Sequence, residues 1–465
     1  LANHSLPSMS EFTPEPIDEE SMEFFEEVEV DTTNPPPEDE DDDDMDEGEG
    51  TGLETDMEGL TTADDEPQTP VPDMSIATLA GMHEDSIYTV AHSRFIPAEN
   101  TVAPGTPQPP PTGIFRVATG GGDDRGGLWE VALPSRETRL VARLEGHTDS
   151  VIAVAFSFDD ALLATGGMDG IVRIWDAASG ALQQSLEGPG DIEWLDWHVK
   201  GNVVLAGSSD GTVWMWLATT GACMQVLAGH EGGVTAGNFT PDGRAIVTGG
   251  TDASVRVWNP KKGICRHVFS GHGCHEAGVT CIAFHPNWIE SESDRLALTG
   301  SEDGTARLMQ VSAKKVVGCF AHSVPLTNEG SAQQQAVEIL SVEAVAFCRT
   351  KSQPWIATAG VDGTVKIWDM TNGALRETCV DPGKVGGEAD PVTKLLWFPN
   401  IPFVVSSSAD GVVRIWDARQ GTLVEALTGH SDMVLDMAAA WDVSPFLLFT
   451  ASDDQTSRLF SLREA

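Results

Sequence analysis

Positive charge is absent from the first part of the chain. No lysine or arginine occurs before Arg94, whereas residues 1–93 contain 29 aspartates and glutamates. The remaining residues are still acidic, with 43 Asp and Glu against 27 Lys and Arg, and the formal charge of the whole chain is −45. Because phosphate binding depends on Lys and Arg that displace counterions, this balance argues against nucleic acid as a direct ligand. It favours a basic protein as the partner, although acidity that only keeps the protein soluble is the alternative explanation.

Paired cysteine motifs and long apolar runs are also missing. The seven cysteines are scattered without CxxC spacing, which is typical of reduced thiols in an intracellular protein. Cys274 and His275 lie beside His272, but no second cluster accompanies them, so we expect no metal site. The chain has no run of about 18 apolar residues, and no basic segment followed by an apolar one opens it. We therefore expect a protein without membrane contact in the cytoplasm, with the nucleus as a second possible location.

Residues 1–73 are predicted to form a disordered acidic tail. They contain runs of Asp and Glu such as residues 38–44, three consecutive prolines at residues 35–37, and few apolar side chains. Such a composition cannot bury enough apolar surface to offset the entropy lost on folding. From Met74 onward the pattern changes to short apolar strands separated by Gly, Asp and Asn turns, which is typical of an all-β domain.

A repeat is visible within this all-β region. Its clearest copy starts at Gly146 and His147, continues through the strand pattern of residues 151–156 and a turn at Asp169, and ends on Trp175. This copy resembles the WD40 repeat. The resemblance implies a β-propeller in which each repeat supplies one four-stranded blade.

Eight copies of the repeat can be aligned. The position of Trp175 is occupied in turn by Trp129, Trp175, Trp216, Trp258, Met309, Trp368, Trp416 and Phe460, and an aspartate stands six residues before each. We therefore predict an all-β fold, an eight-bladed WD40 β-propeller over residues 74–465. The last copy ends at its third strand. An outer strand near residues 75–80 is expected to pair with it and close the ring, since an open ring would leave strand edges unpaired.

The resemblance also implies a hydrogen-bonded tetrad of His, Thr or Ser, Asp and Trp in each blade. The copies that match it residue by residue include His147, Thr165, Asp169 and Trp175; His230, Thr248, Asp252 and Trp258; and His322, Thr358, Asp362 and Trp368. These sets look like nucleophilic triads, but their recurrence around the ring favours a structural role. No P-loop lysine follows the glycines at residues 120–122, so we expect neither a cofactor nor enzymatic activity.

The tetrad histidine is less regular than the aspartate. A Gly-His pair predicts it at His147, His230, His272 and His430, and a histidine without the glycine predicts it at His83 and His322. Blades three and seven have no histidine at this place. We predict that these two blades are degenerate.

The expected binding surface is the face that carries the loops entering each first strand and the turns with the tetrad aspartates, a location that the resemblance implies. The positions mapped to it include five acids and no Lys or Arg. The predicted partner-binding residues are Asp191, Glu193, Glu302, Glu343 and Asp453, with Glu84, Asp85 and Asp432 in nearby loops and Tyr88 and Trp194 as aromatic anchors. Such a surface suits an extended basic peptide; the alternative is that these acids are merely solvated. Two insertions, residues 323–337 and 381–389, are expected to frame the site.

The whole-chain pattern is similar to one group of WD40 proteins. The acidic tail, the eight copies, the acidic face and the opening segment from Ala80 to Tyr88 resemble the angio-associated migratory cell protein family and its fungal counterpart, the dedicated chaperone of the large-subunit ribosomal protein L ten. The resemblance covers residues 74–465, and the tail matches only in composition.

This resemblance implies a function in ribosome biogenesis. The expected protein is a monomeric chaperone that captures the basic amino-terminal segment of ribosomal protein L ten, as a nascent or finished chain, and delivers it to the pre-60S particle. One alternative is a chaperone for another basic client, either a different ribosomal protein or a histone. The other is a signalling or migration scaffold.

Overall fold

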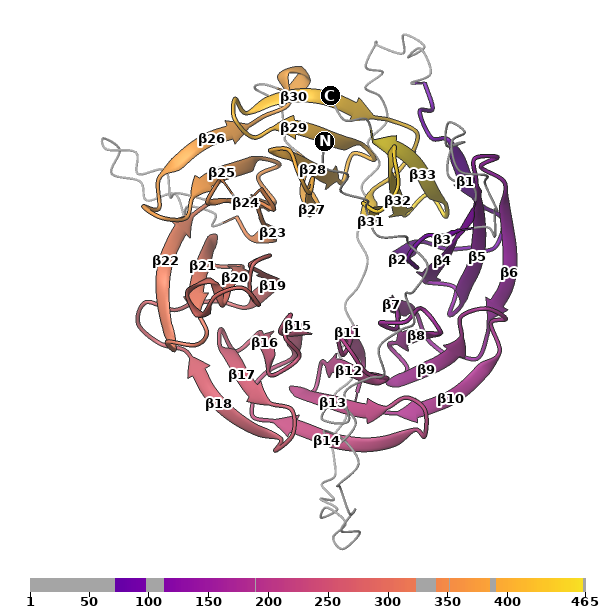
Figure 1. Cartoon of the computed structure of the whole chain (residues 1–465), viewed down its shortest axis with the longest axis horizontal. Coiled ribbons are helices and arrows are strands. Elements are labelled where there is room, and N and C mark those ends of the chain that lie inside the picture. The colour runs from indigo at the N-terminus through magenta and orange to yellow at the C-terminus, as the bar shows by residue number, and fades with distance from the viewer. Residues whose placement is uncertain are drawn as a thin grey trace, which may run out of the picture. The chain divides into compact units, whose positions relative to one another are not determined.

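The computed structural model describes residues 72–97, 113–188, 190–322, 340–350, 352–384 and 390–462. These residues form eight antiparallel sheets arranged in a ring around a central opening (Figure 1). Two 3-10 helices, η1 (Glu292–Asp294) and η2 (Pro382–Lys384), are the only helices in this part of the chain. The predicted all-β, eight-bladed propeller is confirmed. The predicted acidic tail lies outside the described residues, apart from residues 72 and 73.

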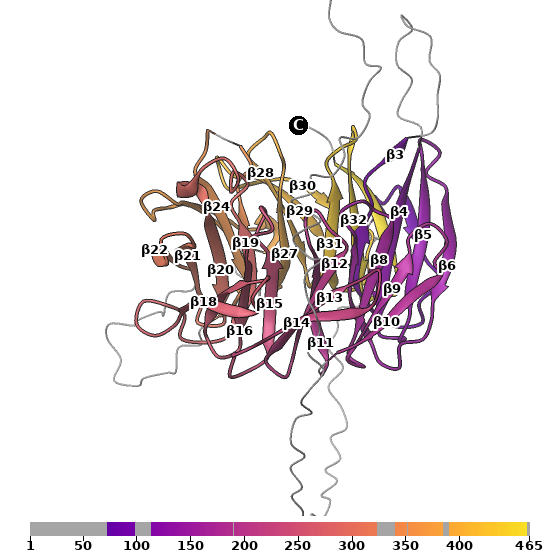
Figure 2. The same ribbon diagram turned by 60° about the horizontal axis from the view of Figure 1, so that its bottom comes forward.

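Each blade has four strands in the same order from the opening to the rim (Figures 1 and 2). The innermost strands are β2 (Ile87–His92), β7 (Val151–Phe156), β11 (Ile192–Trp197), β15 (Val234–Phe239), β19 (Val279–Phe284), β23 (Val342–Phe347), β27 (Val392–Trp397) and β31 (Val434–Ala440). The second strands are β4 (Gly113–Gly121), β8 (Leu162–Gly167), β12 (Val203–Ser208), β16 (Ile246–Gly250), β20 (Leu296–Ser301), β24 (Trp355–Gly360), β28 (Phe403–Ser408) and β32 (Phe446–Ser452).

The two outer positions complete each sheet. The third strands are β5 (Gly126–Leu133), β9 (Ile171–Asp176), β13 (Thr212–Leu217), β17 (Val255–Asn259), β21 (Thr305–Gln310), β25 (Val365–Asp369), β29 (Val413–Asp417) and β33 (Ser457–Leu462). The outermost strands are β6 (Thr138–Leu144), β10 (Leu182–Glu187), β14 (Ala222–Ala228), β18 (Ile264–Phe269), β22 (Lys315–Ala321), β26 (Leu375–Cys379), β30 (Thr422–Leu427) and β1 (Ala77–Leu79). One further strand, β3 (Ile96–Pro97), pairs with β4.

The apolar core lies between neighbouring blades. All residues of the second strands β12, β24 and β28 are buried, because sheets of adjacent blades cover both of their faces. In one cluster, Val172 and Ile174 of blade two pack with Ile192 and Val204 of blade three. Each blade therefore completes its core only with a neighbour, and the ring folds as one unit.

The amino-terminal strand of the propeller completes the last blade. β1, in the segment for which the sequence predicts an outer strand, pairs antiparallel with β33, with Ala77 opposite Leu459. Leu79 is 1% exposed and belongs to the apolar cluster that blades eight and one share. The backbone N–H of Met74 also donates to the carbonyl of Thr428 at 2.8 Å. The two ends of the described chain are thus joined in one sheet.

The prediction of His272 as a tetrad histidine is wrong. His275 takes that place, with its Nδ1 3.1 Å from Asp303 and its Nε2 2.8 Å from Thr299. His272 is exposed in a turn that a hydrogen bond from the backbone N–H of Cys274 closes. Cys274 packs in the apolar cluster of blades four and five. The longer loop therefore separates the Gly-His pair from the strand that it should precede.

Candidate functional site

Complete tetrads assemble in blades one, two, four and six; the set in blade one is His83, Thr119, Asp123 and Trp129. In blade two, His147 Nδ1 lies 2.9 Å from Asp169 Oδ1 and its Nε2 lies 2.8 Å from Thr165 Oγ1. Trp175 Nε1 donates to the same hydroxyl at 3.0 Å. The equivalent contacts join His230, Thr248, Asp252 and Trp258 in blade four and His322, Thr358, Asp362 and Trp368 in blade six. The ring of His322 differs only in turning its Nδ1 toward the hydroxyl.

The histidines of these tetrads are closed to solvent. The side chains of His147 and His230 are 0% exposed, and burial lowers the pKa of both imidazoles. A threonine hydroxyl that accepts the Trp N–H has its own proton left for the neutral imidazole, whose other nitrogen then donates to the aspartate. All polar groups of the tetrad are thereby used within the blade. The tetrads fix the loops of one face, which we call the tetrad face: the loops entering the innermost strands and the turns between second and third strands.

Blades three and seven lack the tetrad histidine. In blade seven, Trp416 Nε1 donates to Ser406 at 2.8 Å, and Asp410 is bound instead by Arg414 and Lys384. In blade three, Ala206 replaces the hydroxyl residue. The turn after Ala206 spells GxSxG over residues 207–211, but it joins two strands, whereas a nucleophile elbow joins a strand to a helix. Neither blade therefore contains a catalytic set.

Five tetrad aspartates are paired with a cation that follows four residues later. Arg173 lies 3.3 Å from Asp169 in blade two. The equivalent pairs are Asp252 with Arg256, Asp362 with Lys366, Asp410 with Arg414, and Asp454 with Arg458. Because these cations neutralise the tetrad carboxylates, the net charge of the tetrad face comes from its other acids.

A β-bulge opens every innermost strand and directs one side chain out of the regular alternation. In β19, for example, the pairing shifts between Val279 and Cys281, so Thr280 is the extra residue. Three of these bulge residues are threonines that donate to a carbonyl at the start of the next innermost strand: Thr235 to Val279, Thr280 to Val342, and Thr393 to Val434. At the same position in other blades stand Tyr88, Glu193 and Glu343. Bulge positions thus serve either contact between blades or the tetrad face.

The first group of predicted binding residues lies on the adjoining blades one and eight. Its members are Glu84, Asp85, Tyr88, Asp432 and Asp453. The carboxylate of Asp85 and the hydroxyl of Tyr88 converge above Gly122, where a Cβ would lie 3.1 Å and 3.2 Å from them. Asp85 and Asp432 are oriented alike, since each accepts the backbone N–H of the residue that follows it at 2.8 Å. Ring closure therefore brings together acids from opposite ends of the chain.

The second group lies at the start of β11 in blade three. Asp191 and Glu193 are both exposed there. Burial and the negative charge of Asp191 raise the pKa of Glu193. The two carboxylates are thus close enough to repel each other, and a cation bound between them would relieve that repulsion.

Trp194 packs between blades three and four. Its indole covers Gly207 and Gly237, so closely that an added Cβ would lie 2.3 Å and 2.2 Å from the ring. Its Nε1 donates to the carbonyl of Val234 at 2.9 Å. The indole therefore contributes to contact between blades. Of the two predicted aromatic anchors, Tyr88 is the exposed one, at 37%.

The third group borders the junction of blades five and six. Glu302 is exposed on the turn after β20, and its carboxylate lies 3.0 Å from the position of a Cβ at Gly278. Glu343 is half-buried at the bulge of β23. Burial raises the pKa of the Cys281 thiol to about 12, and the nearby carboxylate of Glu343 adds to that shift. Glu343 therefore faces blade five, where Glu302 is also located.

The acids of these three groups are unpaired within the part of the chain that the structure describes. No ion pair there involves Glu84, Asp85, Asp191, Glu193, Glu302, Glu343, Asp432 or Asp453. The cations Lys384 and Arg414 of blade seven are engaged by Asp390, Asp410 and Asp381. The tetrad face consequently presents uncompensated negative charge in three places around the ring.

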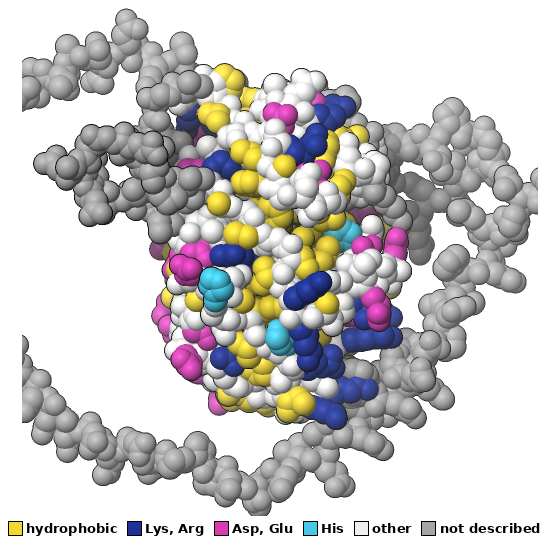
Figure 3. All heavy atoms as spheres, turned by 90° about the vertical axis from the view of Figure 1, so that its left-hand side faces the viewer, with side chains coloured by type: hydrophobic (Ala, Val, Ile, Leu, Met, Phe, Trp, Pro, Cys, Tyr) yellow, Lys and Arg dark blue, Asp and Glu magenta, His cyan; other side chains and the backbone are white. Residues whose placement is uncertain are grey.

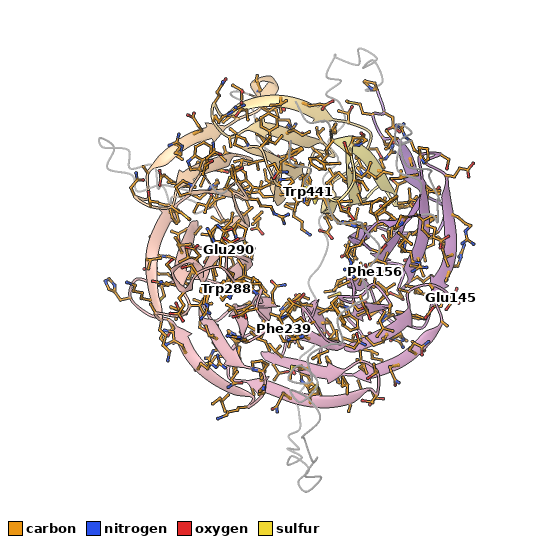
Figure 4. The ribbon with its side chains drawn as sticks, viewed as in Figure 1. Glu145, Phe156, Phe239, Trp288, Glu290 and Trp441 are labelled. Carbon is orange, nitrogen blue, oxygen red and sulfur yellow. The ribbon has the colours of Figure 1, made fainter. Side chains whose placement is uncertain are left out.

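The other mouth of the central opening has a different character. The innermost strands start at the tetrad face, so their last residues lie at the opposite mouth. Figure 4 places Phe156, Phe239 and Trp441 around the opening, at the end of β7, at the end of β15 and directly after β31. The acids therefore gather at one mouth, whereas these three innermost strands end, toward the other, on buried or partly buried aromatic residues.

Several expectations concern groups other than these acids. No three or more His, Cys, Asp or Glu side chains in the described ranges are placed to hold a metal ion. Neither described helix is long and apolar enough to span a membrane. The insertion at residues 323–337 lies outside the described residues, as does the one at 381–389 except for residues 381–384.

Two features of the tetrad face were missed by sequence reasoning. Met168, on the turn before Asp169, is 39% exposed and adds an apolar contact to the face, although it occupies a mapped position. The cation four residues after the tetrad aspartate is the second feature. The repeated spacing of Asp169 and Arg173 in other blades was the signal for it.

The chain matches a known protein family and has known relatives. The family model described as "WD domain, G-beta repeat" matches residues 138–176, 180–216, 221–259, 263–308, 341–369, 382–417 and 421–461. The chain is 33% identical over 392 residues to angio-associated migratory cell protein of Homo sapiens, which covers 84% of this chain and 81% of that protein. The protein of the same name from Canis lupus familiaris matches to the same extent.

Solved structures share the fold. Sqt1 of Saccharomyces cerevisiae superposes with a TM-score of 0.70 at 21% identity, covering 85% of this chain and 100% of that chain. Sqt1 of Chaetomium thermophilum, bound to the N-terminus of the ribosomal protein L10, superposes with a TM-score of 0.64 at 24% identity, covering 84% and 100%.

Proposed function

Because the chain belongs to the WD40-repeat family and is a homologue of angio-associated migratory cell protein, we propose that it is a non-enzymatic binding platform. More specifically, we propose a chaperone that captures a basic amino-terminal segment of ribosomal protein L10 during assembly of the large ribosomal subunit. The observation that carries the proposal is the set of unpaired acids on the tetrad face. The complex of Chaetomium thermophilum Sqt1 with the N-terminus of L10 supports the choice of client.

The three acidic groups suit an extended basic segment. Carboxylates form strong, directional hydrogen bonds with arginine, and the exposed ring of Tyr88 offers a face on which a guanidinium can stack. A segment that reaches two or three groups gains specificity from their spacing around the opening. The summed negative charge also raises the rate of encounter with a basic client.

A basic ribosomal protein needs such a partner before assembly. Free Lys and Arg side chains bind RNA phosphates without sequence preference, which would trap the protein on wrong sites. The tetrad face competes with RNA for those cations and leaves them available for transfer to the pre-60S particle. On this proposal the protein acts as a monomer in the cytoplasm, with the nucleus as a second location, and it meets its client as a nascent or completed chain. It contacts neither nucleic acid nor membrane directly.

Two other functions are alternatives to this proposal. A chaperone for another basic client, such as a different ribosomal protein or a histone, would use the acids in the same way. A signalling or migration scaffold would bind a partner that has no basic segment. The acids of the tetrad face favour the first of these over the second.

Identification of the proteins that co-purify with the full chain tests the proposal. We expect mass spectrometry to find L10 enriched with the wild type and lost with the double variant Glu302→Lys/Glu343→Lys, while a matched variant with reversed acids at the rim, Glu137→Lys/Glu187→Lys, retains it. If a different basic protein is recovered with the wild type and lost with Glu302→Lys/Glu343→Lys, that protein and not L10 is the client. Partners that co-purify equally with the wild type and with both variants would contradict capture on the tetrad face.

A further inference from the structure

The rim of blades four and five concentrates unpaired cations on an otherwise acidic chain. Nine of the 27 Lys and Arg residues fall within residues 244–315. Arg256 and Arg295 have carboxylate partners in Asp252 and Glu292. Five others form no ion pair with any residue in the described ranges: Arg244, Arg266, Arg307, Lys314 and Lys315. Unpaired cations therefore cluster in this sector of the propeller.

Two adjoining hollows lie in this sector. The first, of about 230 Å³, is lined by Arg244, Arg266, Arg295, His267, Trp288 and Lys314, among others. The second, of about 620 Å³, is lined by Arg307, Lys315, His272 and, again, His267 and Lys314. Lys314 joins them across the blade junction, because its Nζ donates to the carbonyl of Arg266 at 3.4 Å. We call the cations Arg244, Arg266, Arg295, Arg307, Lys314 and Lys315 the rim patch.

Several groups of the rim patch lack an acceptor. The Nε atoms of Arg295 and Arg307 are buried and have no hydrogen-bond partner in the described chain. Burial and the positive charge of Lys314 lower the pKa of His267. One carboxylate, Asp242, lines the first hollow, and the residues that line the second include none. An incoming carboxylate would pair with the exposed cations Arg244, Arg266, Lys314 and Lys315, which the described chain leaves without an ion pair.

The rim patch lies on the outer side of the ring, and its second hollow reaches the tetrad face only through the loop of Ser270, His272 and Cys274 that enters β19. Figure 3 faces the side of the ring that carries β18 and β22, and dark blue Lys and Arg side chains gather in its lower half. Both outermost strands contribute to the lining of the second hollow, through Phe269 and Val316 for example. Figure 4 shows Trp288, which lines the first hollow, in the loop that follows β19. The unpaired acids of the tetrad face surround the central opening instead.

We propose that the rim patch is a second interaction surface, which binds an Asp- and Glu-rich segment of a partner protein. Charge complementarity with the exposed, unpaired cations calls for carboxylates. The apolar side chains between the cations, Val257, Val311 and Val316, suit the hydrophobic residues of such a segment. A basic client on the tetrad face and an acidic partner on the rim do not compete, so the propeller holds both at once.

RNA fits the rim patch less well. Bases bind single-strand sites by stacking on exposed aromatic rings. The aromatic side chains of the hollows are buried, with Trp288 2% and Phe269 4% exposed. The formal charge of −45 also repels a long polyanion at a distance, whereas a short acidic segment needs only the local field.

Binding of a short fluorescent peptide of Asp, Glu and Leu to the full chain tests the proposal. The variant Arg266→Glu/Lys314→Glu should bind it at least about tenfold more weakly than the wild type. The matched variant Lys200→Glu/Arg143→Glu, which changes exposed cations elsewhere by the same charge, should stay within about twofold. Equal melting temperatures of the two variants show that both remain folded.

Several outcomes would overturn the proposal. One is that the wild type does not bind the peptide, and another is that both variants lose it equally. Tighter binding of a single-stranded oligonucleotide of equal charge, lost in the Arg266→Glu/Lys314→Glu variant, would make the patch an RNA site. A basic peptide on the tetrad face should be held equally by all three proteins. Its behaviour therefore reports on the proposed chaperone function separately.

Discussion

The guanidinium of Arg173 lies 3.3 Å from the carboxylate of Asp169, the residue four positions before it. The same carboxylate also contacts His147, so two interactions within the blade hold this acid in place. Glu302 and Glu343 have no such cation among the described residues. This difference separates acids that hold the blades together from acids that are free to bind.

Replacement of Tyr88, the only tyrosine of the chain, tests the aromatic contact at the first acidic group. Tyr88→Ala removes the ring and should weaken binding of a basic peptide by about 0.5–1 kcal/mol, the size of an exposed cation–π contact. Tyr88→Phe keeps the ring and should bind like the wild type. Calorimetry measures both, and Phe158→Ala, at a 36% exposed ring outside the tetrad face, is the control. Equal affinity of Tyr88→Ala and the wild type would remove Tyr88 from the site.

Loss of one tetrad hydroxyl tests the structural role of the tetrads. Thr248→Val leaves Trp258 Nε1 and His230 Nε2 without their shared partner. Buried polar groups without partners cost roughly 1–3 kcal/mol each, so the free energy of unfolding should fall by that order. Urea unfolding measures the change, with Thr251→Val on the exposed turn as the control. The affinity of the folded protein for a basic peptide should not change; a loss of affinity without a loss of stability would point to a functional hydroxyl.

The carboxylate of Asp196, in the innermost strand β11, predicts a pH effect. It accepts the backbone N–H of Phe239 at 2.8 Å, and burial raises its pKa from 3.8 to about 6. A raised folded-state pKa means that the ionised acid destabilises the fold above pH 6, and that this penalty is lost as the pH falls toward 3.8. Asp196→Asn should therefore unfold with a free energy higher by on the order of 1–2 kcal/mol at pH 7.5.

The comparison of Asp196→Asn with the wild type across pH distinguishes charge from packing. The difference in the free energy of unfolding should shrink as the pH falls from about 6 to 4, because both proteins are then neutral at this position. A difference that stays constant over this range would show that the substitution acts through shape or hydrogen bonding.

The propeller could be predicted because its signals repeat. The spacing from Asp169 to Trp175 recurs in every blade and does not depend on the rest of the fold. The tetrad histidine is further away in the chain, so loop length affects it. In blade five, the turn at Gly271 moves His275 into the tetrad and leaves His272 exposed. The Gly-His dipeptide does not indicate how long the loop between it and the next strand is.

The candidate site could be predicted only in part. The bulge positions of Glu193 and Glu343 follow from their place in the repeat, because each repeat has the same register. The contact of Trp194 with Gly237 of the next blade depends on packing between sheets, which the pattern of one repeat does not contain. The rim patch arises in the same way, from cations on two neighbouring blades.

Removal of residues 1–71 tests how far the propeller acts alone. The shortened chain keeps β1 and the pairing of Ala77 with Leu459, so the ring should unfold at the same temperature. Specific binding of a basic peptide should persist, while the association rate at low salt should fall because long-range attraction is reduced. Stopped-flow fluorescence measures the rate. Complete loss of binding would show that the acidic segment, rather than the tetrad face, captures the client.

The central claim is that unpaired acids on the tetrad face bind a basic segment of L10. Calorimetry with a peptide of the L10 amino terminus, at low and at physiological salt, tests it most directly. Exposed charges are screened over about 8–10 Å at physiological salt, so the affinity of the wild type should fall steeply between the two conditions. Glu302→Lys/Glu343→Lys should bind at least about tenfold more weakly than Glu137→Lys/Glu187→Lys, which carries the same net charge. Binding that is independent of salt and equal in the two variants would contradict the claim.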